Sequence, residues 1–451
     1  MSEANMTVDD SRPQTIATPT DPGVRHRVRN LFVVGGSMTV DGGEGGVVNG
    51  LFPVIQASLS LGMSALGILT AAGRLVNMIA GPFWVWLARK TSRKFVLALA
   101  TGFWGAWAFG AALSQNFTQL LIFYTIAAAG FAASHAIIPE VIGDSFEDRK
   151  RGRVSGLLYG GTAALGSLLA PLIGQLANVE DGWRYGFAIF GGLNIVFGLL
   201  IVIFYRDPAS GSAERQLADL SAEQRSKTSK VTWSSVVSLM KIRSFTVLLL
   251  SRMLSSHMLF GAFGVVLLVQ DFGLTTALAA SVMAPFGIGY LAGTFIGGFL
   301  SDGLNKLSPN YGRVGLLQGA QFLFALVAAI TLFGGFSGLA PFLLMFGLLG
   351  VAQGLNPGVN RPLVMAIVPP ELRGAAFAIF VSIVESLGFA IYSLVGGFLA
   401  ESIGLTAVMF WLVVVVMTIN GVVLTALYPI YHRDRDAMTA ELEQRRRQVV
   451  R

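Results

Sequence analysis

Hydrophobic residues follow one another along this chain in long runs, separated by short polar or charged stretches. A helix of about 20 residues, rising about 1.5 Å per residue, crosses the hydrocarbon core of a bilayer. In lipid only helices and closed barrels satisfy the backbone hydrogen bonds, and runs of this length favour helices. The pattern predicts twelve spans, at about residues 31–56, 64–88, 95–114, 117–143, 153–177, 185–205, 245–269, 277–300, 314–335, 339–367, 374–400 and 405–429.

Composition agrees with this pattern. Hydrophobic residues make up 53% of the chain and charged residues 13%, which is typical of a multi-pass membrane protein. The predicted fold class is therefore an all-α integral membrane protein. There is no cysteine, so disulfide and thiol chemistry are excluded. The first residues are polar and acidic, unlike a cleaved signal peptide.

A polar stretch at 206–243 divides the spans into six and six. We predict a tail at 1–28, a bundle at 29–205, a linker at 206–243, a second bundle at 244–429 and a tail at 430–451. Within the linker, residues 231–240 are mildly amphipathic and are expected to lie on the inner membrane surface.

The two predicted bundles resemble each other in sequence. Arg151 and Gly166 follow the break after the fourth span, and Arg373 and Gly388 follow the break after the tenth at the same spacing. Internal repeats of this kind are typical of secondary transporters, which bind substrate between the repeats near the bilayer midplane.

The chain is basic, with a net charge of +7 and a pI near 9.8. All but four of its 32 lysines and arginines fall in alternate loops and in the two tails. This positive-inside pattern places both termini in the cytoplasm and favours a membrane over nucleic acid as the partner. We expect a plasma membrane, such as the bacterial inner membrane, with the basic run 445–447 on anionic lipid headgroups.

Two carboxylates, Asp41 and Glu44, lie inside the first span and on one face of its helix. Acidic residues at this depth cost free energy unless they face a cavity or a partner. Counting at about 1.5 Å per residue puts Arg74 level with Glu44, and Asn77 level with Asp41 one turn deeper. We predict that the two acids carry protons and that movement of Arg74 releases or admits them. The alternative is a static ion pair.

Other polar residues inside the spans are candidates for gating or for substrate binding. Glu140 and Asp144 end the fourth span ahead of a basic cluster with Arg151, which suggests a gating ion-pair network. Two prolines five residues apart are expected to break the tenth span and to free backbone carbonyls. The predicted substrate-binding residues are Asn77, His135, Arg252, His257, Asn356, Asn360, Arg361 and Glu385.

Glu385 has two possible partners at this stage. A bridge from Arg361 to Glu385 is compatible with their separation along neighbouring spans. Arg74 is level with Glu385 as well, so a pair between the two halves is equally compatible.

The chain resembles a major facilitator superfamily transporter over residues 28–430, and residues 51–72 are similar to Spinster-like lysolipid transporters. Aligned on Pro53, Glu44 falls where that group has an acidic residue, while Gly45 replaces the arginine that usually follows. The resemblance implies two six-helix bundles related by pseudo-symmetry.

Three motifs of the superfamily can be compared with this sequence. The loop motif after the second span has Arg89 in its aspartate position, so the charge relay seen in relatives is in doubt there; the second copy keeps Asp302. With Arg151 and Arg373 these loops are expected to take part in gating. Gly166 and Pro171 lie in a segment close to the antiporter signature, which implies that this helix seals the interface between the halves. The fourth-span arginine of proton antiporters is missing.

These features predict a proton-coupled transporter that works by alternating access, is monomeric and exports an amphiphilic molecule, lysolipid-like or drug-like. Proton symport that imports a small organic anion is one alternative, and a non-transporting receptor or scaffold on the same fold is another. No nucleotide, metal or hydrolase motif occurs, so we expect no enzyme activity and no cofactor besides protons.

Overall fold

The computed structural model describes residues 26–146, 148–208, 233–369 and 372–450. Throughout these ranges the regular structure is helical, without strands, which confirms the predicted all-α fold class. The helices of the first half are α2 (Arg27–Leu59), α3 (Met63–Lys90), α4 (Arg93–Ala100), α5 (Ala106–Ala112), α6 (Phe117–Ser145), α7 (Asp148–Gln175) and α8 (Gly182–Phe204).

The second half begins with a short helix and has more interruptions. Segments with π-helical hydrogen bonding, Ala378–Glu385 and Phe410–Val415, interrupt two of its spans. Its helices are α10 (Trp233–Ser238), α11 (Arg243–Met253), α12 (Leu259–Gln270), α13 (Thr276–Ser281), α14 (Met283–Leu307), α15 (Gly312–Phe333), α16 (Ala340–Ile367), α17 (Arg373–Phe377), α18 (Ser386–Ile403), α19 (Leu405–Met409), α20 (Val416–Val423) and α21 (Tyr431–Val450).

Eleven of the predicted spans are recovered as helical segments long and apolar enough to cross a membrane, among the residues that the structure describes. The remaining predicted span is α2, a continuous helix of 33 residues. Its sequence holds Asp41, Glu44 and a series of glycines, and these polar and small residues lower its mean hydropathy. The predicted tail at 1–28 and the predicted linker lie largely outside the described residues, so those boundaries stay predictions.

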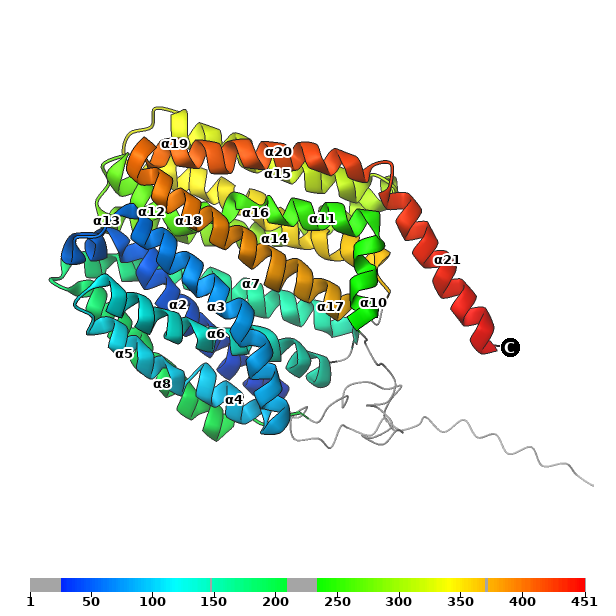
Figure 1. Ribbon diagram of the computed structural model, residues 1–451, viewed down its shortest axis with the longest axis horizontal. Helices are drawn as coiled ribbons and strands as arrows, with labels where there is room; N and C mark the ends of the chain where they lie inside the picture. The colour runs from blue at the N-terminus through cyan, green and yellow to red at the C-terminus, as the bar shows by residue number, and fades with distance from the viewer. Residues whose placement is uncertain (1–25, 147, 209–232, 370–371, 451) are drawn as a thin grey trace, which may run out of the picture.

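The helices gather into two groups, α2 to α8 and α11 to α20, which lie side by side in Figure 1. Helix α3 packs along α18, and α7 packs along α13 and α14, so these helices form the seam between the halves. The packing is close: a Cβ atom added to Gly67 of α3 would lie 2.3 Å from the carbonyl oxygen of Ser393 in α18. Small residues allow such close approach in membranes.

We call the end where α2 begins and α21 leaves the bundle the tail end, and the end with the turn between α2 and α3 the loop end. At the loop end, hydrogen bonds join the two halves. The Gln270 side chain donates to Gln56 Oε1 at 3.0 Å, and the Ser64 backbone N–H donates to Glu401 Oε1 at 2.9 Å.

The predicted break in the tenth span is wrong, because α16 runs without interruption through Pro357 and Pro362. The helix packs closely on α14: a Cβ on Gly354 would lie 2.2 Å from the Tyr290 carbonyl oxygen. Neighbouring helices can satisfy the backbone groups that proline frees. A break lies instead in the seventh span, between α11 and α12.

Candidate functional site

A cavity of about 420 Å³ lies between the two halves. Helices α2, α3, α6 and α7 line it from the first half, and α12, α14, α16 and α18 from the second. Asp41, Glu44, Arg74 and Asn77, which depth counting placed at matching levels, all line this cavity.

The two walls of the cavity differ in chemistry. The first half contributes the four residues just named together with Asn49, Thr70, Tyr124, Thr162 and Ser167. The second half contributes almost only apolar atoms, and Gln353 is its single polar side chain among the described lining residues. Its other lining residues are Met258, Gly261, Ala262, Val265, Met283, Phe286 and Phe389. Such a cavity suits a molecule with a polar part and an apolar part.

The Glu44 side chain is buried, with 8% of its surface exposed. Its carboxylate accepts a hydrogen bond at 3.3 Å from the Asn194 amide of α8. Asp41 Oδ2 is buried without a hydrogen-bond partner among the described residues. Beside them, Gly42 and Gly45 would meet nothing within 4 Å if a Cβ were added. The glycines therefore leave open space next to both acids.

Asn194 was not identified from the sequence as a residue of the site. The signal was available, since it is an amide within α8, a span with a mean hydropathy of 2.6. The residue is 2% exposed, and its contact with Glu44 fixes the direction of that side chain.

The alternative of a static ion pair between Arg74 and Glu44 is not found among the described residues. Within the described part of the chain, Arg74 has no carboxylate oxygen within the 4.0 Å limit of an ion pair. Its guanidinium instead lies 4.8 Å from the centre of the Phe389 ring, a cation–π geometry. Counting residues gives the level of a side chain but not the direction in which it points, and Asn194 holds Glu44.

Both expected partners of Glu385 are wrong as well. Glu385 pairs with Arg252, whose Nε atom lies 3.1 Å from Glu385 Oε2 and whose Nη2 contacts the same oxygen. The two side chains are each 14% exposed. Arg252 lies at the end of α11, next to the break in the seventh span, and Glu385 ends the π-helical segment.

Three predicted substrate ligands lie away from the cavity. Asn356 is buried and accepts a hydrogen bond at 2.6 Å from Gln321, which in turn accepts one from Asn420 at 3.2 Å. His257 packs against the Phe324 ring, 5.8 Å between centroids, and Asn360 is also buried. These residues lie in the core of the second half. Their predicted role in substrate binding is therefore corrected: they contribute to the packing of that half.

His135 and Arg361 are exposed, and neither lines the cavity. The imidazole of His135 lies 4.5 Å from the Phe131 ring and 5.9 Å from the Tyr159 ring. Phe131 does line the cavity, so His135 lies one helical turn from it, toward the tail end.

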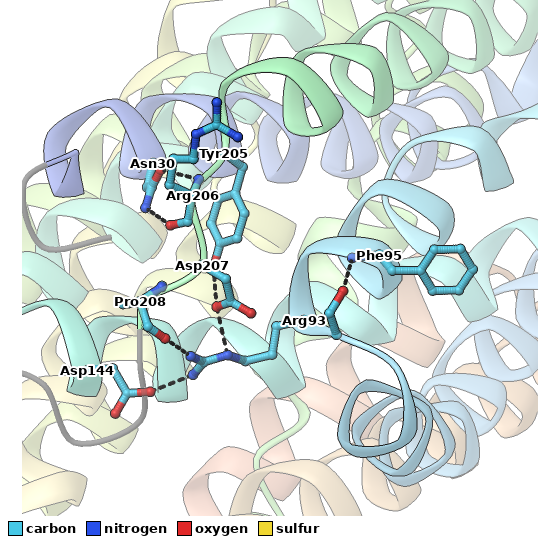
Figure 2. A network of polar contacts seen from close by, with 9 residues as sticks. Asn30, Arg93, Phe95, Asp144, Tyr205, Arg206, Asp207 and Pro208 are labelled. Atoms are coloured by element: carbon cyan, nitrogen blue, oxygen red, sulfur yellow. Dashed lines mark hydrogen bonds and ion pairs between the residues drawn. The ribbon is translucent and has the colours of Figure 1, made fainter. Parts of the chain in front are cut away.

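The tail end of the first half carries a network centred on Arg93 (Figure 2). Arg93 Nη1 lies 2.5 Å from Asp144 and its Nε 2.9 Å from Asp207, and Nη2 donates to the Pro208 carbonyl. Burial raises the pKa of Asp207, although Arg93 opposes this shift. Arg93 therefore joins α4 to α6 and to the segment that follows α8.

The remaining gating candidates also lie at the tail end, divided between the two halves. Asp302 pairs with Arg313 at 3.2 Å within the second half, and Arg373 donates to the Met365 carbonyl at 3.0 Å. Glu140 is exposed at the tail end of α6, and the side chain of Arg151 lies outside the described residues.

Helix α7 packs on the other half through two residues of the predicted segment around Gly166 and Pro171. Pro171 lies inside the unbroken helix. Gly166 lines the cavity, and a Cβ there would meet nothing. The contacts come from Ser167, which lies against Gly287, and from Gly174, which lies against α13.

Two helical halves with a cavity between them are typical of a secondary transporter. A family model described as Major Facilitator Superfamily matches residues 34–330 and 245–449. The chain therefore belongs to the Major Facilitator Superfamily, which confirms the resemblance seen in its sequence.

Within this superfamily the sequence is similar to spinster proteins. It is 28% identical over 171 residues to a sphingosine-1-phosphate transporter, SPNS2, of Danio rerio, covering 37% of this chain and 34% of that protein. It is 25% identical over 374 residues to protein spinster of Drosophila melanogaster, covering 79% of this chain and 59% of that protein. The chain thus matches between a third and three fifths of the length of these relatives.

A solved structure of a bacterial homologue of the human lysosomal transporter Spinster, inward-facing and unoccupied, has the same fold. The TM-score is 0.73 at 20% identity, covering 92% of this chain and 98% of that one.

Proposed function

We propose that this chain is a proton-coupled secondary transporter that exports an amphiphilic molecule by alternating access. The observation that carries the proposal is the two-sided cavity, with Asp41, Glu44 and Arg74 on one wall and apolar side chains on the other. The similarity to a sphingosine-1-phosphate transporter supports an amphiphilic substrate.

In this proposal the polar part of the substrate lies against the first half and the apolar part against Met258, Val265 and Phe286. Arg74 has no ion-pair partner among the described residues, so its charge can attract an anionic group of the substrate. Asp41 and Glu44 hold the coupling proton, because an intramembrane carboxyl group beside a cavity can exchange protons with water.

The proposed direction can be stated in terms of the two ends of the molecule. The distribution of positive charges supports a cytoplasmic position for the tail end. Entry of a proton from the loop side would then accompany release of substrate to that side.

The test uses inverted membrane vesicles and a fluorescent lysolipid. Accumulation of the lysolipid driven by an acidic lumen supports export, since protons then leave the lumen as substrate enters it. Stimulation only in right-side-out vesicles by external acid would overturn export in favour of importing symport.

Binding can be examined separately with the purified protein. A ligand that binds only the folded state raises the thermal midpoint. We expect lysolipids with anionic headgroups to do so, and we expect Arg74→Gln to reduce the shift. Arg361→Ala is the matched control, because Arg361 is exposed and lies off the cavity. An equal loss in both variants would contradict the assignment of Arg74.

A further inference from the structure

The amino terminus of α3 lacks a capping side chain of its own. The first N–H groups of any helix have no partner inside that helix. The N-cap residue here is Gly62, which makes no side-chain hydrogen bond to the helix. A helix that spans a membrane therefore begins at the loop end without the usual Ser, Thr, Asp or Asn acceptor.

The missing acceptor comes from the opposite half of the molecule. Glu401 of α18 accepts a hydrogen bond from the Ser64 N–H at 2.9 Å. Ser64 is the second residue of α3, so this is one of the N–H groups that a capping residue ordinarily satisfies. The carboxylate also carries a negative charge, which the positive end of the helix dipole favours.

Gly62 makes room for this carboxylate. A Cβ atom at position 62 would lie 2.2 Å from Glu401 Oε1, closer than any non-bonded contact allows. The backbone of Gly62, with φ −82° and ψ 173°, is open to any residue. Glycine at this position is thus required by the contact with Glu401 and not by the backbone conformation.

Two neighbouring contacts belong to the same closed arrangement. Gln56 and Gln270 form a hydrogen bond at 3.0 Å between α2 and α12, and a Cβ on Gly397 would lie 3.0 Å from Gly67 Cα. The halves must part at the loop end if the cavity is to open there, and parting separates Ser64 from Glu401.

We propose that Glu401 is a latch that caps α3 across the interface between the halves and holds the loop end closed. Glu401 is a positioning residue in this scheme, since it touches no residue of the cavity lining. The inference rests on the proposed alternating access, and it adds the contact that sets how long the loop end stays closed.

The chain contains no cysteine, so two labels can be introduced without removing native residues of that type. Thr118, at the start of α6, and Ser337, before α16, are exposed at the loop end of opposite halves. Single-molecule fluorescence energy transfer between dyes on Thr118→Cys and Ser337→Cys reports the dwell time of the closed state.

Glu401→Ala removes the cap and is expected to shorten the closed dwell time about five- to tenfold, the size expected for the loss of an N-cap acceptor. Gly62→Ala displaces the carboxylate while keeping its charge, and it should act in the same direction. Glu401→Gln keeps an acceptor oxygen and should retain part of the effect. Glu180→Ala, which removes another exposed carboxylate of the loop end, should leave the dwell time unchanged.

Unchanged dwell times in both Glu401→Ala and Gly62→Ala would overturn the latch. Glu401→Ala and Gly62→Ala change the two sides of the same contact. If one variant fails to fold, the other still tests the latch. A wild-type chain that never opens at the loop end would contradict alternating access itself, which distinguishes failure of the proposed function from failure of the latch.

Discussion

The ion pair between Arg252 and Glu385 gives the sharpest prediction about stability. Both side chains are 14% exposed, and two guanidinium nitrogens contact one carboxylate oxygen. Removal of one partner leaves a charge in a site with little water, which typically costs about 3–5 kcal/mol. Replacement of both partners by apolar side chains of similar size is typically close to neutral.

We therefore expect Arg252→Met and Glu385→Met each to lower the thermal midpoint by roughly 6–10 °C, at about 2 °C per kcal/mol for a protein of this size. The double variant should return to within about 2–3 °C of wild type. The assay is thermal unfolding of the purified protein in detergent.

An ion pair of the same half whose carboxylate is exposed serves as the control. Arg313 and Asp302 lie 3.2 Å apart, but the Asp302 side chain is 73% exposed. Surface carboxylates contribute about 0–1 kcal/mol through such pairs, so Asp302→Met should shift the midpoint by less than about 2 °C. Additive losses in the Arg252 and Glu385 variants, with a double variant worse than either, would refute the reasoning.

Two further predictions concern buried amides and the tail-end network. Asn356→Leu removes the acceptor of the buried Gln321 amide, so it should destabilise the protein by about 1–3 kcal/mol in thermal unfolding, while the shift produced by a bound lysolipid is unchanged. Asp144→Asn should lower the midpoint at pH 7 more than Asp207→Asn. Because the pKa of Asp207 is raised by burial, its contribution to stability is present at acidic pH and is lost as pH rises. Equal midpoints for the two variants would contradict this difference.

The level of each residue along the membrane could be predicted from the sequence. Helices rise by a constant amount per residue, so counting from the ends of the apolar runs placed Asp41, Glu44, Arg74 and Asn77 at matching levels, and all four line the cavity. The spans themselves followed from the length of the runs, and α2 lies at its predicted place although Asp41 and Glu44 interrupt its apolar run.

The direction of each side chain around its helix could not be predicted. His257 and Asn356 have the polarity and the depth of substrate ligands, yet they face the core of their own half. Counting depth gave Glu385 two possible arginine partners, Arg361 and Arg74. In the structure Glu385 pairs with Arg252, which lies next to the break after α11.

The position of the helix break in the second half was also predicted wrongly from the sequence. Pro357 suggested a break, but α16 is continuous there and packs along α14. The break at Leu254, between α11 and α12, carries no proline or glycine. Such features depend on contacts between helices distant in the chain, which no single segment of sequence contains.

The central claim is that carboxylates on the cavity couple proton movement to movement of an amphiphile. It is tested most directly by lysolipid accumulation in inverted vesicles with an acidic lumen, compared between wild type and Glu44→Gln. Glu443→Gln, an exposed residue of α21, is the control. The account predicts that accumulation in Glu44→Gln falls to the level seen without a pH gradient, while wild type and the control accumulate the lysolipid equally. Accumulation by Glu44→Gln at the wild-type level would contradict it.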